Sequence, residues 1–335
     1  MSAPTKILVI RFSSIGDIVL TTPVVRALHE QLHAEVHFLT KPAFAPLVAA
    51  NPHIAQVHVL QKSLLDTIQQ LRTQQFDLVV DLHHNLRTAI VKAGLMKPAY
   101  SFPKRNMEKW LLVQFKKNFL PREHVVDRYM KTIAPLGAKP DGKGLDFFIH
   151  SSQQLHVAEV DQHLSQPFLA WVIGAKFGTK QFPPSRIAEV LNHASFPNMP
   201  IVLIGGKEDQ DAAQHIVACT NRRVFNACGR FGLQQSASIV SQAAAVIAND
   251  TGFMHIAAAL KRPVISVWGN TVPAFGMTPY YGQLPVKNQA VEVEGLPCRP
   301  CSKIGYRQCP QQHFNCMMKI NADDLLKALQ HCLTH

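Results

Sequence analysis

The sequence has no run of apolar residues approaching the roughly 20 that a helix needs to cross a bilayer. Its beginning also lacks the charged, apolar and small-residue pattern of a secretory signal. We therefore expect the chain to work in the cytoplasm. In that compartment its seven cysteines are expected to be mostly reduced thiols.

Three motifs of nucleotide-dependent enzymes are missing as well. The turn after the β-rich run 6–12 is residues 13–17, Ser-Ser-Ile-Gly-Asp, which has neither the three-glycine dinucleotide fingerprint nor the lysine of a phosphate-binding loop. A Rossmann-type oxidoreductase and a P-loop ATPase are therefore disfavoured. No DxD-type metal motif is apparent, because Asp323-Asp324 falls at the start of the last helical stretch.

Length and charge describe what is present. A chain of 335 residues with 47% apolar and 17% charged residues is long enough for two α/β domains with full cores. The formal net charge of +12 favours an anionic partner such as nucleic acid, a phosphorylated substrate or an acidic membrane surface. Because no helix-turn-helix or RNA-binding signature is visible, we expect no nucleic-acid partner.

Stretches typical of strands and helices alternate in two similar halves. Strands are expected near 6–12, 35–40, 56–60 and 77–81, with helices such as 17–32 and 63–74 between them. In the second half, strands are expected near 168–173, 200–205, 223–226, 244–249 and 264–268. This alternation predicts an α/β fold with parallel sheets covered by helices on both faces.

We place the domain boundary near residues 150–166. The expected parts are an N-terminal domain of residues 1–155, a C-terminal domain of residues 165–315 and a terminal helix of residues 321–335. Ligands of parallel sheets bind beyond the carboxyl ends of the strands, where Asp17 and Asp250 both lie. Two facing domains would bring both aspartates to one cleft. Taken alone, Asp17 is more readily explained as a helix N-cap than as a catalytic residue.

Residues 249–260, Asn-Asp-Thr-Gly-Phe-Met-His-Ile-Ala-Ala-Ala-Leu, predict a strand end, a tight turn and a helix. Asp250 or Thr251 can cap this helix, and Gly252 leaves room for a ligand beside the backbone. The free N–H groups and the helix dipole then form an anion site that suits a diphosphate, with His255 in the first turn. A capped helix with a structural histidine is the alternative.

Basic and aromatic residues interleave in residues 102–120, Phe-Pro-Lys-Arg-Asn-Met-Glu-Lys-Trp-Leu-Leu-Val-Gln-Phe-Lys-Lys-Asn-Phe-Leu. As a helix, this segment has an apolar stripe beside a basic one. Such a helix can lie on an anionic surface or cover a phosphorylated amphiphile. The alternative is an ordinary surface helix whose apolar stripe lies in the core.

Several short motifs occur in a fixed order. They are residues 10–18 (Ile-Arg-Phe-Ser-Ser-Ile-Gly-Asp-Ile), 81–87 (Asp-Leu-His-His-Asn-Leu-Arg), Gly174-Ala175 followed by Lys180 and Pro183, 205–208 (Gly-Gly-Lys-Glu) and 250–255 (Asp-Thr-Gly-Phe-Met-His). Their order and spacing, over nearly the whole chain, resemble the bacterial heptosyltransferase family, glycosyltransferase family 9. The resemblance implies the GT-B architecture, with two facing Rossmann-like domains, the acceptor on the N-terminal one and the donor on the C-terminal one.

The resemblance also implies a reaction, the inverting transfer of heptose from ADP-heptose to the inner core of lipopolysaccharide. Such a transfer needs a base for the acceptor hydroxyl and positive charge or N–H donors on the leaving diphosphate. Asp17 is the expected base. The expected donor-binding residues are Lys180, Glu208, Asp250, Thr251, Gly252 and His255. The expected acceptor-binding residues are Ser14, Arg87, Lys104 and Arg105.

Within this set, Lys180 is expected on the diphosphate and Glu208 on the ribose hydroxyls. Apart from the resemblance, Lys180 is explained as a solvated surface lysine and Glu208 as an acidic residue at a helix N-terminus. Phe182 stands where the family commonly has tryptophan, which weakens the assignment of detail around the donor. The expected partners are an ADP-sugar, an anionic glycolipid (Kdo-lipid A or heptosylated core) and the inner-membrane surface, so that the protein would be peripheral on that membrane.

We expect no cofactor and no catalytic metal. Cys298, Cys301, Cys309 and Cys316 form a C-x2-C-x7-C-x6-C array, which is compatible with a structural zinc site or with reduced thiols that pack a loop. Two alternatives for the function stay open: a glycosyltransferase that uses another nucleotide sugar, and a non-enzymatic protein that binds an anionic ligand.

Overall fold

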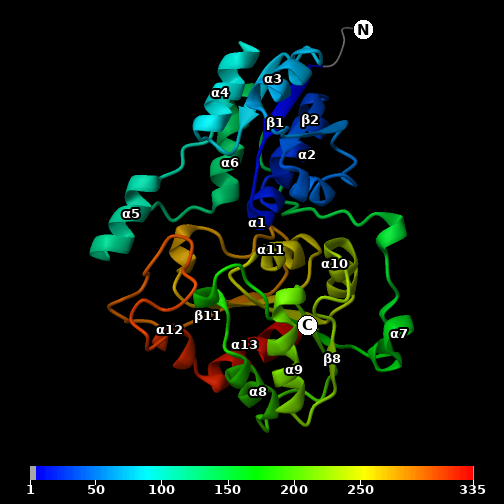
Figure 1. Ribbon diagram of the computed structural model, residues 1–335, viewed down its shortest axis with the longest axis vertical. Coiled ribbons are helices and arrows are strands. Elements are labelled where there is room, and N and C mark those ends of the chain that lie inside the picture. The colour runs from blue at the N-terminus through cyan, green and yellow to red at the C-terminus, as the bar shows by residue number, and fades with distance from the viewer. Residues whose placement is uncertain (1–4, 335) are drawn as a thin grey trace. The chain divides into compact units, whose positions relative to one another are not determined.

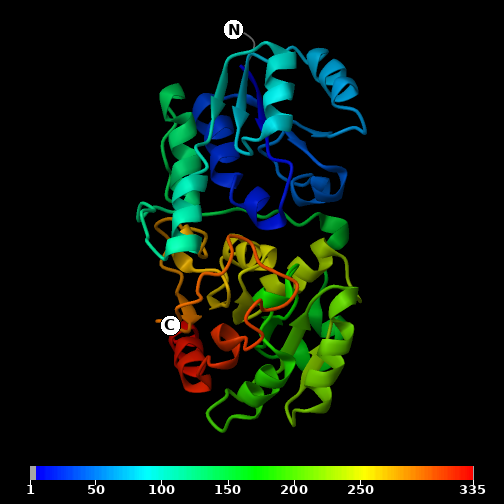
Figure 2. The ribbon, with the colours of Figure 1, turned by 60° about the vertical axis from the view of Figure 1, so that its left-hand side comes forward.

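The structure, a computed structural model, describes residues 5–334 and is drawn as a ribbon in Figures 1 and 2. Its contacts divide the chain into two units. The first comprises the chain up to Lys104, Glu123–Phe148 and Tyr280–Leu284, and the second comprises Arg105–Arg122, Ile149–Pro279 and the chain from Pro285 onward. The expected ranges were 1–155 and 165–315. In the structure, residues 105–122 belong to the second unit instead of the first, and residues 280–284 belong to the first unit instead of the second.

The first unit is a five-stranded parallel sheet with helices on both faces (Figure 2). Its elements are β1 (Lys6–Ile10), α1 (Ile15–Val19), α2 (Thr22–Leu32), β2 (Glu35–Thr40), η1 (Pro42–Leu47), β3 (Gln56–Val59), α3 (Leu64–Arg72), β4 (Leu78–Asp81), α4 (Leu86–Leu95), β5 (Ala99–Ser101), α6 (Val125–Ile133) and η2 (Ala134–Leu136). The strand order is β3-β2-β1-β4-β5. The strands β1 and β2 read as nearly continuous buried runs because helices cover both of their faces.

The helix expected over residues 17–32 is two helices, α1 and α2. Pro23 explains the break, because proline has no N–H to donate to the preceding turn and its ring clashes with that turn. Leu20 ends α1, Thr21 is the N-cap of α2, and Pro23 lies in the first turn, where a missing N–H costs nothing.

The second unit is a six-stranded parallel sheet in the order β11-β10-β9-β6-β7-β8. Its helices and strands are α5 (Asn106–Phe115), α7 (Val157–Val160), β6 (Leu169–Val172), α8 (Pro184–Asn192), β7 (Ile201–Ile204), α9 (Gln210–Ala218), β8 (Val224–Asn226), α10 (Leu233–Ser241), β9 (Ala245–Asn249), α11 (Gly252–Ala259), β10 (Val264–Trp268), β11 (Asn288–Glu292), α12 (Asn315–Met318) and α13 (Ala322–Leu333). Its short 3₁₀ turns are η3 (Ser151–Gln153), η4 (Gln162–Ser165), η5 (Gly178–Lys180), η6 (Lys207–Asp209) and η7 (Pro273–Phe275).

Two parallel sheets, as expected for an α/β protein of the GT-B class, are confirmed. All of the strands expected from the sequence are present, but the edge strands β5 and β11 were not expected. An edge strand needs no apolar run on both faces, and three residues of β11 are exposed. The terminal helix is α13, capped by Asn321, and residues 1–4 and 335 of the expected ranges lie outside the described residues.

Each sheet has one point where the strand order reverses. In the first sheet it lies between β1 and β4, and in the second between β6 and β9. At such a point the loops after the two central strands diverge, which opens a ligand crevice at their carboxyl ends. Residues 11–17 and 81–84 occupy this position in the first unit, and residues 173–182 and 249–252 in the second. Among residues 5–334, no helix combines the length and apolar character needed to cross a membrane.

Candidate functional site

Asp17 is held at the reversal point of the first sheet. Ser14 is the N-cap of α1, and its backbone N–H and its hydroxyl both donate to Asp17 Oδ2, at 3.1 and 2.6 Å. Asp17 is the third residue of the helix and completes a capping box. The explanation of Asp17 as the N-cap is therefore wrong, because Ser14 takes that place and leaves the Asp17 carboxylate one turn into the helix.

Arg11 fixes the other oxygen of this carboxylate. Its Nη2 lies 2.6 Å from Asp17 Oδ1, while Nε donates to the Ser13 carbonyl and Nη1 to the Leu82 carbonyl. The guanidinium is buried. Its bonds to the two carbonyls join the segment after β1 to the segment after β4. Burial acts to raise the pKa of Asp17, but Arg11 and Ser14 outweigh it and lower that pKa to about 2. Asp17 is therefore an anion at every physiological pH.

Asp81 organises the loop beside it. This fully buried carboxylate accepts from the backbone N–H groups of His83 and His84, at 3.0 and 2.7 Å, and pairs with the Lys92 ammonium at 3.0 Å. Burial, together with the charges of Arg11 and Lys104, lowers the pKa of His83 to about 4. His83 is therefore a neutral imidazole within electrostatic range of Asp17. Sequence reasoning gave Asp81 no role, although a carboxylate that ends a buried strand before two histidines was a visible signal.

The residues expected to bind the acceptor are only partly brought together. The Ser14 hydroxyl donates to Asp17, and Lys104 is half-buried within electrostatic range of His83. Arg87 is exposed in the first turn of α4. Arg105 belongs to the second unit and pairs with Glu108 of α5 at 3.0 Å.

The basic and aromatic segment forms a helix, α5, over part of the expected range. Leu112 is its only buried hydrophobic residue, whereas Met107, Trp110 and Phe115 are exposed, as is Phe119 beyond its end. The alternative of an ordinary surface helix with its apolar stripe in the core is therefore wrong. Lys116 anchors the helix end by donating to the carbonyl of Pro300 at 2.8 Å. Within the second unit, α5 is thus held by a few contacts, while Met107, Trp110 and Phe115 face solvent.

Lys180 and Asp250 meet at the reversal point of the second sheet. The Lys180 Nζ lies 2.5 Å from Asp250 Oδ2, and the Thr271 hydroxyl donates to the same oxygen at 2.7 Å. Thr251 is the N-cap of α11 and accepts from the Phe253 N–H at 3.2 Å. The cap expected from the sequence is thus Thr251, while Asp250 is the partner of Lys180. An ammonium and a helix N-terminus therefore share one corner of the second unit.

Asn249 holds the loop that carries Lys180. Its amide donates to the Ile173 carbonyl at 3.1 Å, and its Oδ1 accepts from the Phe182 N–H at 3.1 Å. Both ends of the loop 173–182 are thereby attached to the end of β9. Thr179 adds two more bonds, because its N–H donates to the Tyr306 carbonyl and its hydroxyl accepts from the Tyr306 N–H. Sequence reasoning missed Asn249, and a buried amide that directly precedes Asp250 was the available signal.

The Gly-Gly turn after β7 presents Glu208. Asp209 folds back under this turn, accepts from the Gly206 N–H at 2.8 Å and is buried. A Cβ at Gly174 would clash with Asp209 Oδ2, so a larger residue there would displace this carboxylate from the Gly206 N–H. Burial raises the pKa of Asp209. Asp209 is therefore the structural carboxylate, and Glu208 is left exposed on the neighbouring loop.

The remaining residues that are expected to bind the nucleotide-sugar donor differ in their exposure to solvent. Gly252 is the first residue of α11 and half-buried. His255 lies on the same helix but is only 2% exposed, so its ring is part of the protein interior. The structure therefore brings Lys180, Asp250, Thr251 and Gly252 to one corner, with Glu208 on the next loop and His255 behind them.

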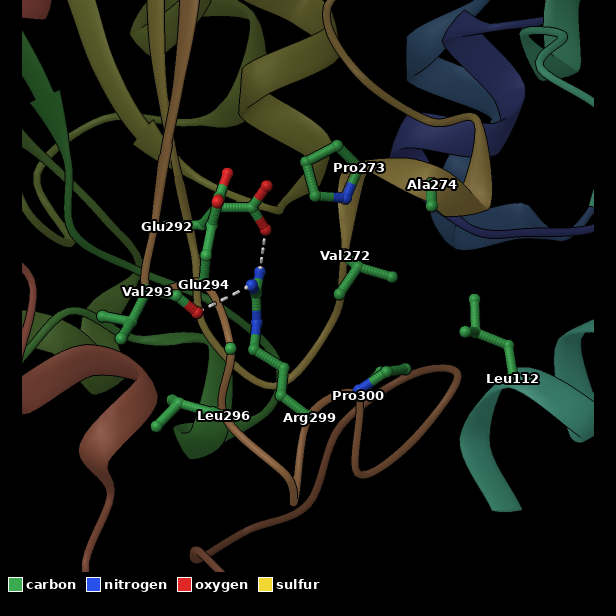
Figure 3. Close-up of a pocket in the computed structure, with 11 residues that line it drawn as sticks. Leu112, Val272, Pro273, Ala274, Glu292, Val293, Glu294, Leu296, Arg299 and Pro300 are labelled. Carbon is green, nitrogen blue, oxygen red and sulfur yellow. Dashed lines mark hydrogen bonds and ion pairs between the residues drawn. The ribbon is translucent and has the colours of Figure 1, made fainter. Parts of the chain in front are cut away.

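A cavity of about 300 Å³ lies elsewhere in the second unit (Figure 3). Its wall comprises Leu112 of α5, residues 272–274, residues 292–296 and residues 299–300. Arg299 dominates it, pairing with Glu292 at 2.5 Å and donating to the carbonyls of Gly269 and Thr271. None of the residues that are expected to bind the nucleotide-sugar donor lines this cavity. Because Thr271 also bonds Asp250, Arg299 supports the Lys180–Asp250 corner from behind.

All seven cysteines are free thiols, as the sequence predicts. Burial raises the pKa of Cys316 to about 12 and also raises that of Cys301, so both are protonated at neutral pH. Within residues 5–334, no three His, Cys, Asp or Glu side chains are placed so that they could hold a metal ion. The segment 298–316 packs against Thr179, which makes it part of the support of the Lys180 loop.

The chain is similar in sequence and in fold to known glycosyltransferases. The chain is 25% identical to lipooligosaccharide heptosyltransferase 2 of Haemophilus ducreyi, over 98% of this chain and 99% of that protein. Among solved structures it resembles a family 9 glycosyltransferase of Veillonella parvula (TM-score 0.77, 20% identity, covering 99% and 98% of the two chains). It also resembles Escherichia coli ADP-heptose lipopolysaccharide heptosyltransferase II (TM-score 0.70, 20% identity, covering 98% of each chain).

The fold of these solved structures is thus the fold of this chain. The family model of glycosyltransferase family 9 (heptosyltransferase) matches residues 64–313, which span most of both units. This protein therefore belongs to glycosyltransferase family 9.

Proposed function

We propose that this protein transfers heptose from ADP-heptose to an acceptor hydroxyl in the inner core of lipopolysaccharide, with inversion and without a catalytic metal. The observation that carries the proposal is the Lys180–Asp250 pair beside the capped N-terminus of α11. The names of two similar proteins support the substrate classes, since one acts on lipooligosaccharide and the other is named for ADP-heptose.

The donor diphosphate is proposed to bind at the Lys180–Asp250 corner. An ammonium and the N–H groups at a helix N-terminus both stabilise negative charge that grows on a leaving phosphate. Lys180 is only 16% exposed, so its charge acts in a partly desolvated setting. These groups supply the electrostatic stabilisation that a metal ion gives other transferases. Glu208, which is exposed, is proposed to accept from the ribose hydroxyls.

Asp17 is proposed to be the base. The acceptor oxygen forms a bond to the anomeric carbon, the bond from that carbon to the diphosphate breaks, the hydroxyl proton passes to Asp17, and ADP leaves. Each carboxylate oxygen can accept more than one hydrogen bond, so the bonds to Arg11 and Ser14 leave capacity for the acceptor hydroxyl. Because the pKa of about 2 makes Asp17 a weak base, the proton moves late, once bond formation has made the hydroxyl acidic.

The acceptor is proposed to be an anionic glycolipid, Kdo-lipid A or a heptosylated core. Arg87, Lys104 and Arg105 offer cations to its acidic groups. The exposed Trp110 and Phe115 of α5, followed by Lys116 and Lys117, suit its acyl portion or the inner-membrane surface. We therefore propose a cytoplasmic enzyme that works peripherally on the inner membrane.

The donor proposal is tested by replacing Lys180. Lys180→Ala should weaken ADP binding by roughly 2–3 kcal/mol, because a charge-assisted contact is lost while the Asp250 carboxylate is left facing the diphosphate. Isothermal titration calorimetry with ADP measures the affinity. Lys176→Ala, an exposed lysine of the same loop, is the control and should bind like the native protein. Equal affinities for native protein and Lys180→Ala would remove Lys180 from the site.

The same experiment separates charge from structure. If repulsion by Asp250 contributes to the loss, the double variant Lys180→Ala/Asp250→Asn should recover part of the ADP affinity. A double-mutant cycle with Asp250→Asn gives the coupling between the two residues. Additive effects would show that the pair observed in the structure does not control donor binding.

The acceptor proposal is tested by charge reversal. Lys104→Glu combined with Arg105→Glu should raise the KM for the glycolipid acceptor, because favourable contacts with its acidic groups become repulsive. Donor affinity should stay unchanged. Lys327→Glu on α13, where the side chain is 77% exposed, is the control for a general change in charge. An unchanged acceptor KM at low salt would leave residues 104 and 105 with a structural role only.

The base proposal is tested by Asp17→Asn. Turnover should fall by about 10²–10⁴, the usual contribution of general base catalysis. Since Asn also weakens the contact with buried Arg11, some stability will be lost as well. The control is Ser63→Ala, which removes the N-cap of α3 in the same unit and should cost about 1 kcal/mol of stability without lowering kcat.

The pH dependence gives a second test of Asp17. Its folded pKa is lower than the usual 3.8, so its stabilising effect is present above about pH 4 and is lost as the pH falls towards 2. The native protein should therefore lose more stability than Asp17→Asn over this range in denaturant titrations.

In the test of turnover, a native-like kcat of Asp17→Asn would move the search for a base to His83 and His84.

A further inference from the structure

We propose that α4 is a membrane-docking helix of the first unit, which binds the surface of an anionic bilayer through Leu86 and Ile90. This inference rests on the proposed function, because a lipid-linked acceptor is presented at a membrane. It assigns a partner to the apolar side chains Leu86 and Ile90, which the transfer reaction does not use, and it does not rest on α5; Arg87 of the same helix is also proposed to contact the acceptor.

The α4 helix has two apolar faces, and the protein interior uses one of them. Val91 and Leu95 are buried in the same cluster as Ile68 and Leu71 of α3. The two helices lie side by side (Figure 1). They pack so closely that a Cβ on Gly94 would lie 2.7 Å from the Ile68 side chain. The inner face of α4 is therefore buried in the core of the first unit. This packing does not explain the apolar side chains on the outer face.

The outer face is apolar and open to solvent. Leu86 and Ile90 are four residues apart, so their side chains lie side by side on the helix surface. They are 78% and 42% exposed, and Met96 at the helix end is 79% exposed. A single exposed leucine is ordinary on a protein surface. Apolar side chains on both sides of one helix are unusual, because the outer one gains nothing from folding.

Charge identifies the partner. Residues 82–107 contain no Asp or Glu but five Lys and Arg, of which Arg87 and Lys97 lie exposed on α4 and just beyond it. An exposed apolar face on a segment that carries Lys and Arg but no Asp or Glu is typical of a helix that lies in the headgroup layer of an anionic membrane.

The same charge disfavours a second copy of this chain as the partner. Two α4 helices packed face to face would place Arg87 and Lys97 of one copy near the same cations of the other. Like charges across an interface oppose association. An anionic bilayer instead offers phosphates to these cations and acyl chains to Leu86 and Ile90.

Co-sedimentation with vesicles tests the proposal. The full-length protein is mixed with vesicles of phosphatidylglycerol and phosphatidylcholine, or of phosphatidylcholine alone. The native protein should bind the anionic vesicles and release them as salt rises. Leu86→Ser/Ile90→Ser should bind them about tenfold more weakly, since two apolar side chains no longer enter the bilayer. The control is Leu65→Ser on α3, where a leucine 75% exposed is followed by Asp66, and its binding should match the native protein.

A second variant, Lys97→Glu, covers the case in which the double variant does not fold, and it should also weaken binding to anionic vesicles. The proposal is overturned if native protein does not bind these vesicles, or if both α4 variants bind like the native protein. It is also overturned if Leu65→Ser loses as much, or if analytical ultracentrifugation shows a native dimer that Leu86→Ser/Ile90→Ser splits.

Failure of this inference is distinguishable from failure of the proposed function. Transfer to a deacylated, soluble acceptor requires no membrane, so Leu86→Ser/Ile90→Ser should keep native kcat and KM in that assay. Native transfer without vesicle binding would overturn α4 docking alone. Vesicle binding that depends on α4, without transfer from ADP-heptose by the native protein, would overturn the proposed function alone.

Discussion

The buried Arg11 guanidinium is the constraint on which the first unit depends. It joins the end of β1 to the end of β4 and holds Asp17 Oδ1 at 2.6 Å. Its charge is compensated by Asp17, and the Asp17 carboxylate is in turn oriented by Ser14. A buried ion pair of this kind is costly to break from either side, because the remaining charge has no partner. The position of the proposed base is therefore as rigid as the sheet itself.

The second unit holds a charged side chain in a similar way, but there the charge is positive. Asp250 holds the Lys180 ammonium at the end of β9, where we propose that the donor diphosphate binds. Asn249 and Thr179 attach the Lys180 loop to its surroundings, so the ammonium is placed before a ligand arrives. Preorganised charge of this sort costs no reorganisation during the reaction. Each reversal point thus holds an ion pair, Arg11 with Asp17 in the first unit and Lys180 with Asp250 in the second.

Local patterns in the sequence predicted the parallel sheets, the central strands and a helix cap at Asp250 or Thr251, because each depends on a few neighbouring residues. Three features were beyond such patterns. The break at Pro23 was missed because the apolar spacing continues through it. The roles of Asn249 and Asp209 depend on contacts with loops far away in the sequence. The apolar stripe of α5 could be assigned to core or solvent only once the packing was known, since both give the same helical spacing.

The most direct test of the central claim is the mass of the acceptor after reaction. Purified native protein is incubated with ADP-heptose and a heptose-free Kdo-lipid A or an inner core that carries heptose, and the glycolipids are analysed by mass spectrometry. The account predicts an acceptor heavier by one heptosyl unit, with one ADP released for each unit transferred and full activity in the presence of a metal chelator. An unchanged acceptor with ADP-heptose, together with transfer from a different nucleotide sugar, would contradict it.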